Sequence, residues 1–341
     1  MGVAAHDAVA VRPIARCTAA LLLLLSGVAM GTSLDAFSWL RPAISVDAAA
    51  QSRLDRGEVI VRVLPSADGE LGVFAASRVN ADPEMFVTWV NAIAQLKKSR
   101  FVIGVRRLSD PPVFEDLQDI SLDDVDLEDL RRCRPGDCSV KLTIEDIEAL
   151  RHAADVSGAE WKDAVQEQFR RVVWDRITSY QTSGFRGLQP YADRHRTVAP
   201  NSVFSVLVDH SPYLQSNAFA PADVESFFYW SKEQYGAGKA VIGLTHVDIV
   251  RPRLAGSMRV AAVSREVFAT HYRNASLGLT ALTEDASGHR YLVYVNRSQL
   301  DLLGGIFGPW KRSLLEGRLK SESAGVFSEI RRRIESGPPP E

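Results

Sequence analysis

Two histidines in the C-terminal half of the chain are the side chains best suited to acid–base chemistry. His246 lies in GLTHVDI and His271 in FATHYRN, with Arg273 two residues further on. Both segments alternate apolar and polar residues as strands do, so the two imidazoles would meet if these strands are neighbours. Glu225 or Glu233 would then supply the acid of an acid–base site. A hydrogen-bonded structural role for each histidine, and a structural ion pair for Arg273, are the alternatives.

Tyrosines in neighbouring segments add candidate contacts to a ligand. Tyr229 belongs to ESFFYWSKEQY and Tyr294 to RYLVYVNRSQL. Aromatic side chains on a strand either pack in the core or line an apolar ligand site, and both interpretations stay open. The candidate ligand-binding residues are Tyr229, His246, His271, Arg273 and Tyr294.

The common motifs of other enzyme classes are not found in the sequence. There is no GxSxG, and ASLGL around Ser276 lacks the first glycine of that motif. GxGxxG, a phosphate-binding loop and HExxH are also not found. We therefore assign no catalytic residue, no metal site and no cofactor, and leave open whether the protein is an enzyme.

An acidic segment, residues 115–129, carries eight carboxylates among Leu, Ile and Val. It lacks the glycine and the terminal glutamate of an EF-hand, so a calcium loop is disfavoured. The pattern predicts a solvated face of a half-buried segment.

The N-terminus has the pattern of a secretory signal. Arg12 and Arg16 precede an uncharged stretch from Cys17 to Gly31, which is shorter than the roughly 20 apolar residues of a membrane span. We expect a signal peptide over residues 1–31, with cleavage as late as residue 50, and a linker over 32–56. The expected location is the periplasm or the medium, and an uncleaved N-terminal anchor is the alternative.

Two cysteines predict a disulfide. Cys133 and Cys138 enclose a turn with Pro135 and Gly136, which can bring the sulfurs together. An oxidising compartment favours that bond, and no further cysteine pair or nearby histidine supplies a metal site.

Strands and one long helix must position these residues. Alternating segments predict strands near residues 59–64, 70–79 and 101–108, and again within 225–235, 240–250, 264–282 and 290–300. Asp82 and Pro83 mark one helix start, and Thr143 with Asp146 marks a capping box. A helical block is expected over about 143–220. A C-terminal helix beginning near Pro309 has an apolar stripe: Trp310, Leu314, Leu315, Leu319, Val326, Phe327, Ile330 and Ile334.

This element order resembles the helix-grip arrangement of the START-like (SRPBCC) superfamily. The resemblance covers roughly residues 72–138 and 227–335. It implies an α+β fold in which a curved antiparallel sheet grips the C-terminal helix and leaves a cavity between them, here within a single domain (57–341) with a helical insertion. The segments ESFFYWSKE, LTHVDIV, HYRNASLGLT and YLVYVNRSQLD also resemble an uncharacterised family of exported bacterial proteins, which brings no known catalytic residues.

Composition narrows the function further. The chain has 341 residues, 46% hydrophobic residues and a net charge of -2, which gives no general attraction to nucleic acid. The leading hypothesis is an exported protein that binds a hydrophobic or amphipathic small molecule or lipid between sheet and helix. The alternatives are an enzyme with a His/Arg/Glu site and an envelope interaction protein without a ligand. Peripheral membrane contact and the oligomeric state are left open.

Overall fold

The computed structural model describes residues 34–67, 69–193, 196–215, 219, 222–236, 238–253, 256–303 and 308–340. The expected signal peptide lies outside these residues. From Leu34 onward the chain forms one unit. No helix in the described ranges combines the length and the apolar character that a membrane crossing requires.

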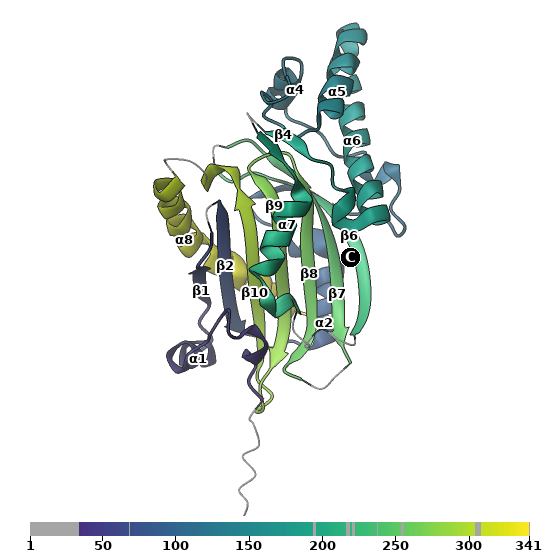
Figure 1. Ribbon diagram of the computed structural model, residues 1–341. Helices are drawn as coiled ribbons and strands as arrows, with labels where there is room; N and C mark the ends of the chain where they lie inside the picture. Colours follow the sequence, from purple (N-terminus) through teal and green to yellow (C-terminus); the bar gives the residue numbers. More distant parts are fainter. Residues whose placement is uncertain are drawn as a thin grey trace, which may run out of the picture. The chain divides into compact units, whose positions relative to one another are not determined.

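An antiparallel sheet of eight strands is the centre of the fold (Figure 1). Its order is β1-β2-β10-β9-β8-β7-β6-β3, so the N-terminal hairpin pairs with the last strand. The prediction of an α+β fold with an antiparallel sheet and a C-terminal helix is confirmed. The strands are β1 (Ile60–Leu64), β2 (Glu70–Arg78), β3 (Val102–Arg107), β6 (Ala222–Glu233), β7 (Val241–Pro252), β8 (Met258–Ala269), β9 (Arg273–Glu284) and β10 (Arg290–Leu300); β4 (Tyr191–Asp193) and β5 (Arg196–Val198) form a separate small hairpin.

Two of the described helices, α2 and α5, begin at the caps that the sequence predicts. Asp82 Oδ1 accepts a hydrogen bond from the Met85 amide at 2.7 Å. Thr143 and Asp146 form the predicted reciprocal capping box. The helices are α1 (Ala48–Asp55), α2 (Pro83–Asn91), α3 (Ile93–Leu96), α4 (Asp124–Leu130), α5 (Ile144–Val156), α6 (Trp161–Ser183), α7 (Pro200–Asp209) and α8 (Gly308–Glu335).

Helices cover both faces of the sheet, and Figure 1 shows α7 in front of it and α2 behind it. We call the face that packs against α1, α6 and α7 the α6 face, and the face that packs against α2 and α8 the α8 face. Each strand of the sheet sends alternate residues to the two faces. Phe228 and Trp230 therefore pack on the α6 face, and Phe227 and Tyr229 on the α8 face.

The C-terminal end of α8 is fixed to α2 and α3. Phe327 and Ile334 are buried on the α8 face. The indole of Trp89 donates a hydrogen bond to the Gly337 carbonyl at 2.8 Å, and Arg333 Nη1 donates to the Leu96 carbonyl at 2.7 Å. These bonds hold the helix end beside the sheet.

The structure corrects the expected linker over residues 32–56. Phe37 and Leu40 are buried in the main core, and the Phe37 ring lies 5.2 Å from that of Tyr291. Asp47 caps α1 by accepting from the Ala50 amide at 2.7 Å. The described part of this segment therefore belongs to the folded unit, because its apolar residues cover the α6 face of the sheet.

The structure also divides the predicted strand 264–282 into β8 and β9. A turn at Thr270, His271 and Tyr272 separates them. Tyr272 has a φ of 62°, a left-handed conformation that is rare for a residue with a side chain. This turn contains neither glycine nor proline, so the alternating pattern of residues 264–282 gave no indication of it.

Candidate functional site

Half-buried polar side chains occupy the middle of the α8 face. They belong to β8, β9 and β10, which are interior strands with a neighbour on each side. Solvent reaches these side chains although the strands that bear them are central. We call the set the polar floor: Ser264, Glu266, Ser276, Thr280, Tyr294 and Asn296.

The strand register puts the floor residues side by side. Ser264 pairs with Gly278, and Gly278 pairs with Asn296. A Cβ at Gly278 would lie 2.4 Å from Ser264 Oγ, so glycine is what lets the serine side chain lie across β9. In the next row Glu266 pairs with Ser276. These two adjacent rows of paired residues form a patch of polar side chains across β8, β9 and β10.

Apolar packing borders the polar floor on two sides. On one side, residues of the sheet pack against α2 and the C-terminal half of α8: Phe227, Val247, Ile249, Val260, Leu282 and Leu292. On the other side, Leu71 and Val73 of β2 pack with Leu303, Leu315 and Leu319. The α8 face is thus polar in the middle and apolar at its borders.

Lys97 and Glu233 form the first of two ion pairs near the floor. Lys97 Nζ lies 2.9 Å from Glu233 Oε1, and Glu233 is only 5% exposed. Burial by itself would raise the pKa of Glu233, but Lys97 and then Arg273 hold it well below its ordinary value. Burial opposes the charge of Lys97 too, and Glu233 nevertheless raises the pKa of that lysine well above its usual range. Both groups are therefore charged at neutral pH.

Arg273 and Glu266 form the second pair. Nε and Nη2 of Arg273 each donate to one oxygen of Glu266, both at 2.6 Å. A Cβ at Gly243 would lie 2.5 Å from Glu266 Oε1, so the absence of a side chain there makes room for the pair. We call Lys97, Glu233, Glu266 and Arg273 the charged cluster.

Tyr294 belongs to the polar floor, opposite Thr280 of β9. Burial raises the pKa of its hydroxyl to about 12. The charges of Lys97 and Arg273 act to lower that pKa, whereas Tyr229 and Glu233 act to raise it. Lys97 Nζ is also 5.3 Å from the centre of the Tyr229 ring.

The structure thus places three of the five candidate residues on or against the α8 face. Tyr229 and Tyr294 lie on this face, and Arg273 pairs with Glu266, which also lies on it. Sequence reasoning missed Lys97 and Glu266, which complete the site. Lys97 follows the last residue of α3, so no strand pattern indicated it, and its partner Glu233 is distant in sequence.

His246 lies on the α6 face. Its Nδ1 is 3.3 Å from the Tyr180 hydroxyl, and its ring centre is 4.6 Å from that of Phe228. Burial lowers the pKa of His246, Asp248 raises it and Arg265 lowers it. The imidazole therefore packs between α6 and the sheet and does not face α8.

His271 lies in the β8–β9 turn and contacts α4. Its Nε2 is 2.9 Å from Asp126 Oδ2, and its Nδ1 is 2.8 Å from the Ser139 carbonyl oxygen. Lys239 also donates to Asp126, at 2.8 Å. The two histidines share no partner in the hydrogen bonds of the described residues, so the structure does not bring them into one site.

Asp126 also departs from the expected solvated face of residues 115–129. It is 2% exposed, whereas Asp124 in the same helix is exposed. The predicted disulfide follows this helix: Cys133 and Cys138 are bonded, with their Cα atoms 4.7 Å apart. The bond closes a loop directly before Ser139, whose carbonyl group holds His271.

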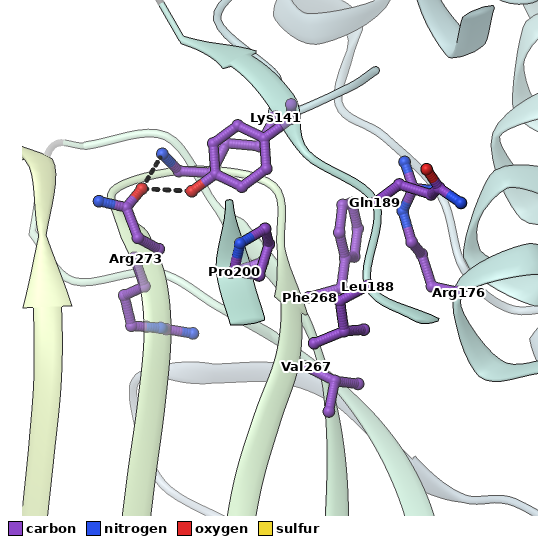
Figure 2. A pocket seen from close by; sticks show the side chains of 11 residues that line it. Lys141, Arg176, Leu188, Gln189, Pro200, Val267, Phe268 and Arg273 are labelled. Atoms are coloured by element: carbon purple, nitrogen blue, oxygen red, sulfur yellow. Dashed lines mark hydrogen bonds between the residues drawn. The ribbon is translucent and has the colours of Figure 1, made fainter. Parts of the chain in front are cut away.

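A small pocket lies at the opposite side of the sheet, beneath the helical block. Figure 2 shows Lys141, Arg176, Phe268 and Arg273 around it, so Arg273 lines this pocket as well as pairing with Glu266. Lys141 Nζ donates to Asn274 Oδ1 at 2.8 Å and forms an ion pair with Asp301. The cavity volume is about 10 Å³, room for about one water molecule. A second hollow is open at the surface near α7, and neither of these two hollows is lined by α8.

Searches for similar proteins found no matching family model, no similar curated protein and no similar solved structure.

Proposed function

We propose that this chain is an exported protein that binds an amphipathic small molecule or lipid between the sheet and α8. The observation that supports it most is the polar floor, because half-buried Ser, Asn, Glu and Tyr side chains line the middle of an otherwise apolar sheet face. A face that only packs against a helix is normally apolar throughout. Polar groups on such a face serve to orient a bound molecule.

The proposal includes a helix-grip arrangement. In that arrangement α8 closes over the polar floor, with its C-terminal end fixed by Phe327 and Ile334 and its N-terminal half forming the wall through Leu315 and Leu319. The polar part of the ligand contacts the floor, and its apolar part contacts the bordering leucines and valines.

Export is the second part of the proposal. The apolar N-terminal segment after Arg16 supports it, and so does the disulfide, since such bonds persist in oxidising compartments. N-terminal sequencing of the secreted or periplasmic protein tests it. A mature chain that starts near residue 32, before the buried Phe37, is the expected result, and a chain that still starts at Met1 would contradict export.

Native mass spectrometry of the protein purified from the periplasm tests the binding. We expect a co-purified molecule that is lost in Thr280→Phe, because an aromatic ring at this half-buried floor position fills the site. The matched control is Thr88→Phe, at an exposed position on the outer side of α2, which should keep the molecule. Equal retention by both variants would place the molecule elsewhere on the protein and refute the proposed site.

The enzyme hypothesis requires His246 and His271 to act in one site with Arg273. His246 packs against α6 and His271 against α4, while Arg273 pairs with Glu266 of the polar floor. The geometry therefore favours binding over acid–base catalysis by these residues.

A further inference from the structure

We propose that the open hollow between α6 and α7 binds a small sugar that carries an oxyanion, either a carboxylate or a phosphate. This hollow is not lined by α8, so the inference goes beyond the proposed function. Its volume of about 480 Å³ lies within the range of roughly 300–1,000 Å³ that small-molecule sites have. The lining residues come from the end of α6, from the short 3-10 helix η4 (Gly184–Gly187) and from the first two turns of α7: Ser183, Phe185, Arg186, Asn201, Ser202 and Ser205.

Two glycines fold η4 closely against the end of α6. Gly184 has a φ of 57°, a conformation that residues with a side chain rarely adopt. A Cβ at Gly187 would lie 2.1 Å from the Ser179 carbonyl oxygen, so glycine is what lets the chain pass this close to α6. The turn between these glycines is therefore defined by backbone geometry, and it places Phe185 and Arg186 in the wall of the hollow.

Arg186 is the charged residue among those that line the hollow, and no carboxylate lines it. With the residues that the structure describes, Arg186 forms neither an ion pair nor a side-chain hydrogen bond. Lys97, Lys141 and Arg273, by contrast, each contact a carboxylate. A guanidinium has five N–H donors in a planar fork that matches a carboxylate or a phosphate. An oxyanion is therefore the ligand group that this arginine binds best.

The α7 side of the hollow offers both hydrogen-bond donors and acceptors. Oδ1 of Asn201 accepts from the Ser202 amide at 2.8 Å, which leaves the Nδ2 group of Asn201 as a donor. Oγ of Ser205 donates to the Asn201 carbonyl at 3.1 Å, so the lone pairs of that oxygen remain as acceptors. Each hydroxyl of a sugar both donates and accepts, and it can therefore pair with such a mixed set of groups.

Phe185 adds apolar surface beside these polar groups. Its ring stacks on that of Phe204, with the ring centres 4.3 Å apart, and the Tyr180 ring centre is 5.7 Å away. The Phe185 ring is thus held in place, and it is still only half-buried. The C–H groups of a sugar ring can pack on the exposed part of such an aromatic ring, as aromatic side chains do in small-molecule sites.

Ligand-observed NMR titration with four probes built on one glucose ring tests the inference. The probes are glucuronate, glucose 6-phosphate, glucose and protonated glucosamine. We expect the full-length mature protein to bind at least one of the two oxyanionic probes about tenfold or more tightly than the neutral and cationic probes. The two oxyanionic arms separate a carboxylate ligand from a phosphate ligand.

Three variants attribute the preference to the hollow. Arg186→Gln should lower the affinity for the oxyanionic probes to that for glucose. Arg151→Gln is the matched control, because Arg151 is an exposed arginine of α5 that also forms no ion pair with the described residues. Ser205→Phe places a ring in the hollow and should weaken the binding of every probe about tenfold or more. All three residues are exposed, so the melting temperatures should stay unchanged.

Three results would each overturn the inference. They are equal affinity for the oxyanionic and neutral probes, a preference that Arg186→Gln leaves intact, and no binding of any sugar probe at about 10 mM.

Dodecanoate, an amphiphile that probes the α8 face, separates this inference from the proposed function. Its affinity should be the same in the wild type and in Arg186→Gln. Weaker dodecanoate binding by Arg186→Gln would show that the hollow binds amphiphiles, and would contradict a sugar site. If dodecanoate does not bind and the preference for oxyanionic sugars holds, the proposed function fails and this site stands.

Discussion

The imidazole of His271 is held between two acceptors, with Nε2 2.9 Å from Asp126 Oδ2. Its Nδ1 faces the carbonyl oxygen of Ser139, which can only accept, so Nδ1 carries a proton. Nε2 faces a carboxylate whose pKa lies below its ordinary value: burial would raise it, but His271 and Lys239 lower it. The buried carboxylate of Asp126 therefore contacts both His271 and Lys239.

Asp126→Asn tests the role of this buried carboxylate. The substitution keeps the shape and removes the charge that His271 and Lys239 share, so the free energy of unfolding in urea should fall by about 3–5 kcal/mol. Asp124→Asn in the same helix is the control, since Asp124 is exposed and the change should stay within about 0.5 kcal/mol. Similar small losses in both variants would show that Asp126 is not a buried charge.

The same variant has a pH signature. Because the folded pKa of Asp126 is lowered, its contribution to stability is present above the unfolded pKa of about 3.9 and is lost as the pH falls through the folded value. Asp126→Asn should therefore lose most stability near neutral pH and approach the wild type at acidic pH. A stability difference that does not change between neutral and acidic pH would contradict the assignment.

His246, whose folded pKa is also lowered, gives a pH dependence of the same sign in a higher pH range. Burial lowers its folded pKa, so on acidification the unfolded chain binds a proton near pH 6.5 that the folded chain still resists. Wild-type stability should therefore decrease as the pH falls from 7 through the ordinary histidine pKa. His246→Gln should remove that part of the slope, and His152→Gln, at an exposed position of α5, should retain it. The free energy of unfolding in urea, measured between about pH 5 and 8, tests this prediction. Equal dependence of that free energy on pH in all three proteins would refute it.

The disulfide should stabilise the loop that holds His271. Closing so short a loop is worth about 2 kcal/mol by loop-entropy arguments. The double substitution Cys133→Ser and Cys138→Ser should lower the free energy of unfolding by that amount. A reducing agent should destabilise the wild type similarly and leave the double variant unchanged. In the native protein both cysteines should resist alkylation until they are reduced, and rapid alkylation would contradict the bond.

Local signals were sufficient for much of the fold. The Asp82 cap, the Thr143–Asp146 capping box and the strand alternation each depend on residues close in sequence, and the structure confirms them. The site depends on pairs that no local pattern encodes. His271 and Asp126 are 145 residues apart, and their contact exists only because the β8–β9 turn meets α4. An alternating segment also does not show which helix will pack on which of its two faces. His246 and Tyr229 therefore could not be assigned to opposite faces of the sheet from the sequence.

The segment expected to be a linker shows the same limit. Its apolar residues do not follow a helical or strand period, so they carry no local signal. Phe37 nevertheless packs against Tyr291 of the last strand, and Gln51 Nε2 donates to the Tyr291 hydroxyl at 2.8 Å. Burial by a distant strand, not local propensity, orders this segment.

Alanine substitutions along α8 separate its packing function from its proposed binding function. Ile334 is 1% exposed, so Ile334→Ala should cost about 2–5 kcal/mol and leave dodecanoate binding unchanged. Leu315 is only half-buried beside Leu71 and Val73, so Leu315→Ala should cost less stability and weaken dodecanoate binding. Val326 is 37% exposed, and Val326→Ala is the control that should change neither. Urea unfolding and calorimetry on the three variants give both readouts. A Leu315→Ala variant that loses as much stability as Ile334→Ala, with binding intact, would mean that α8 packs solidly on the sheet and leaves no room for a ligand.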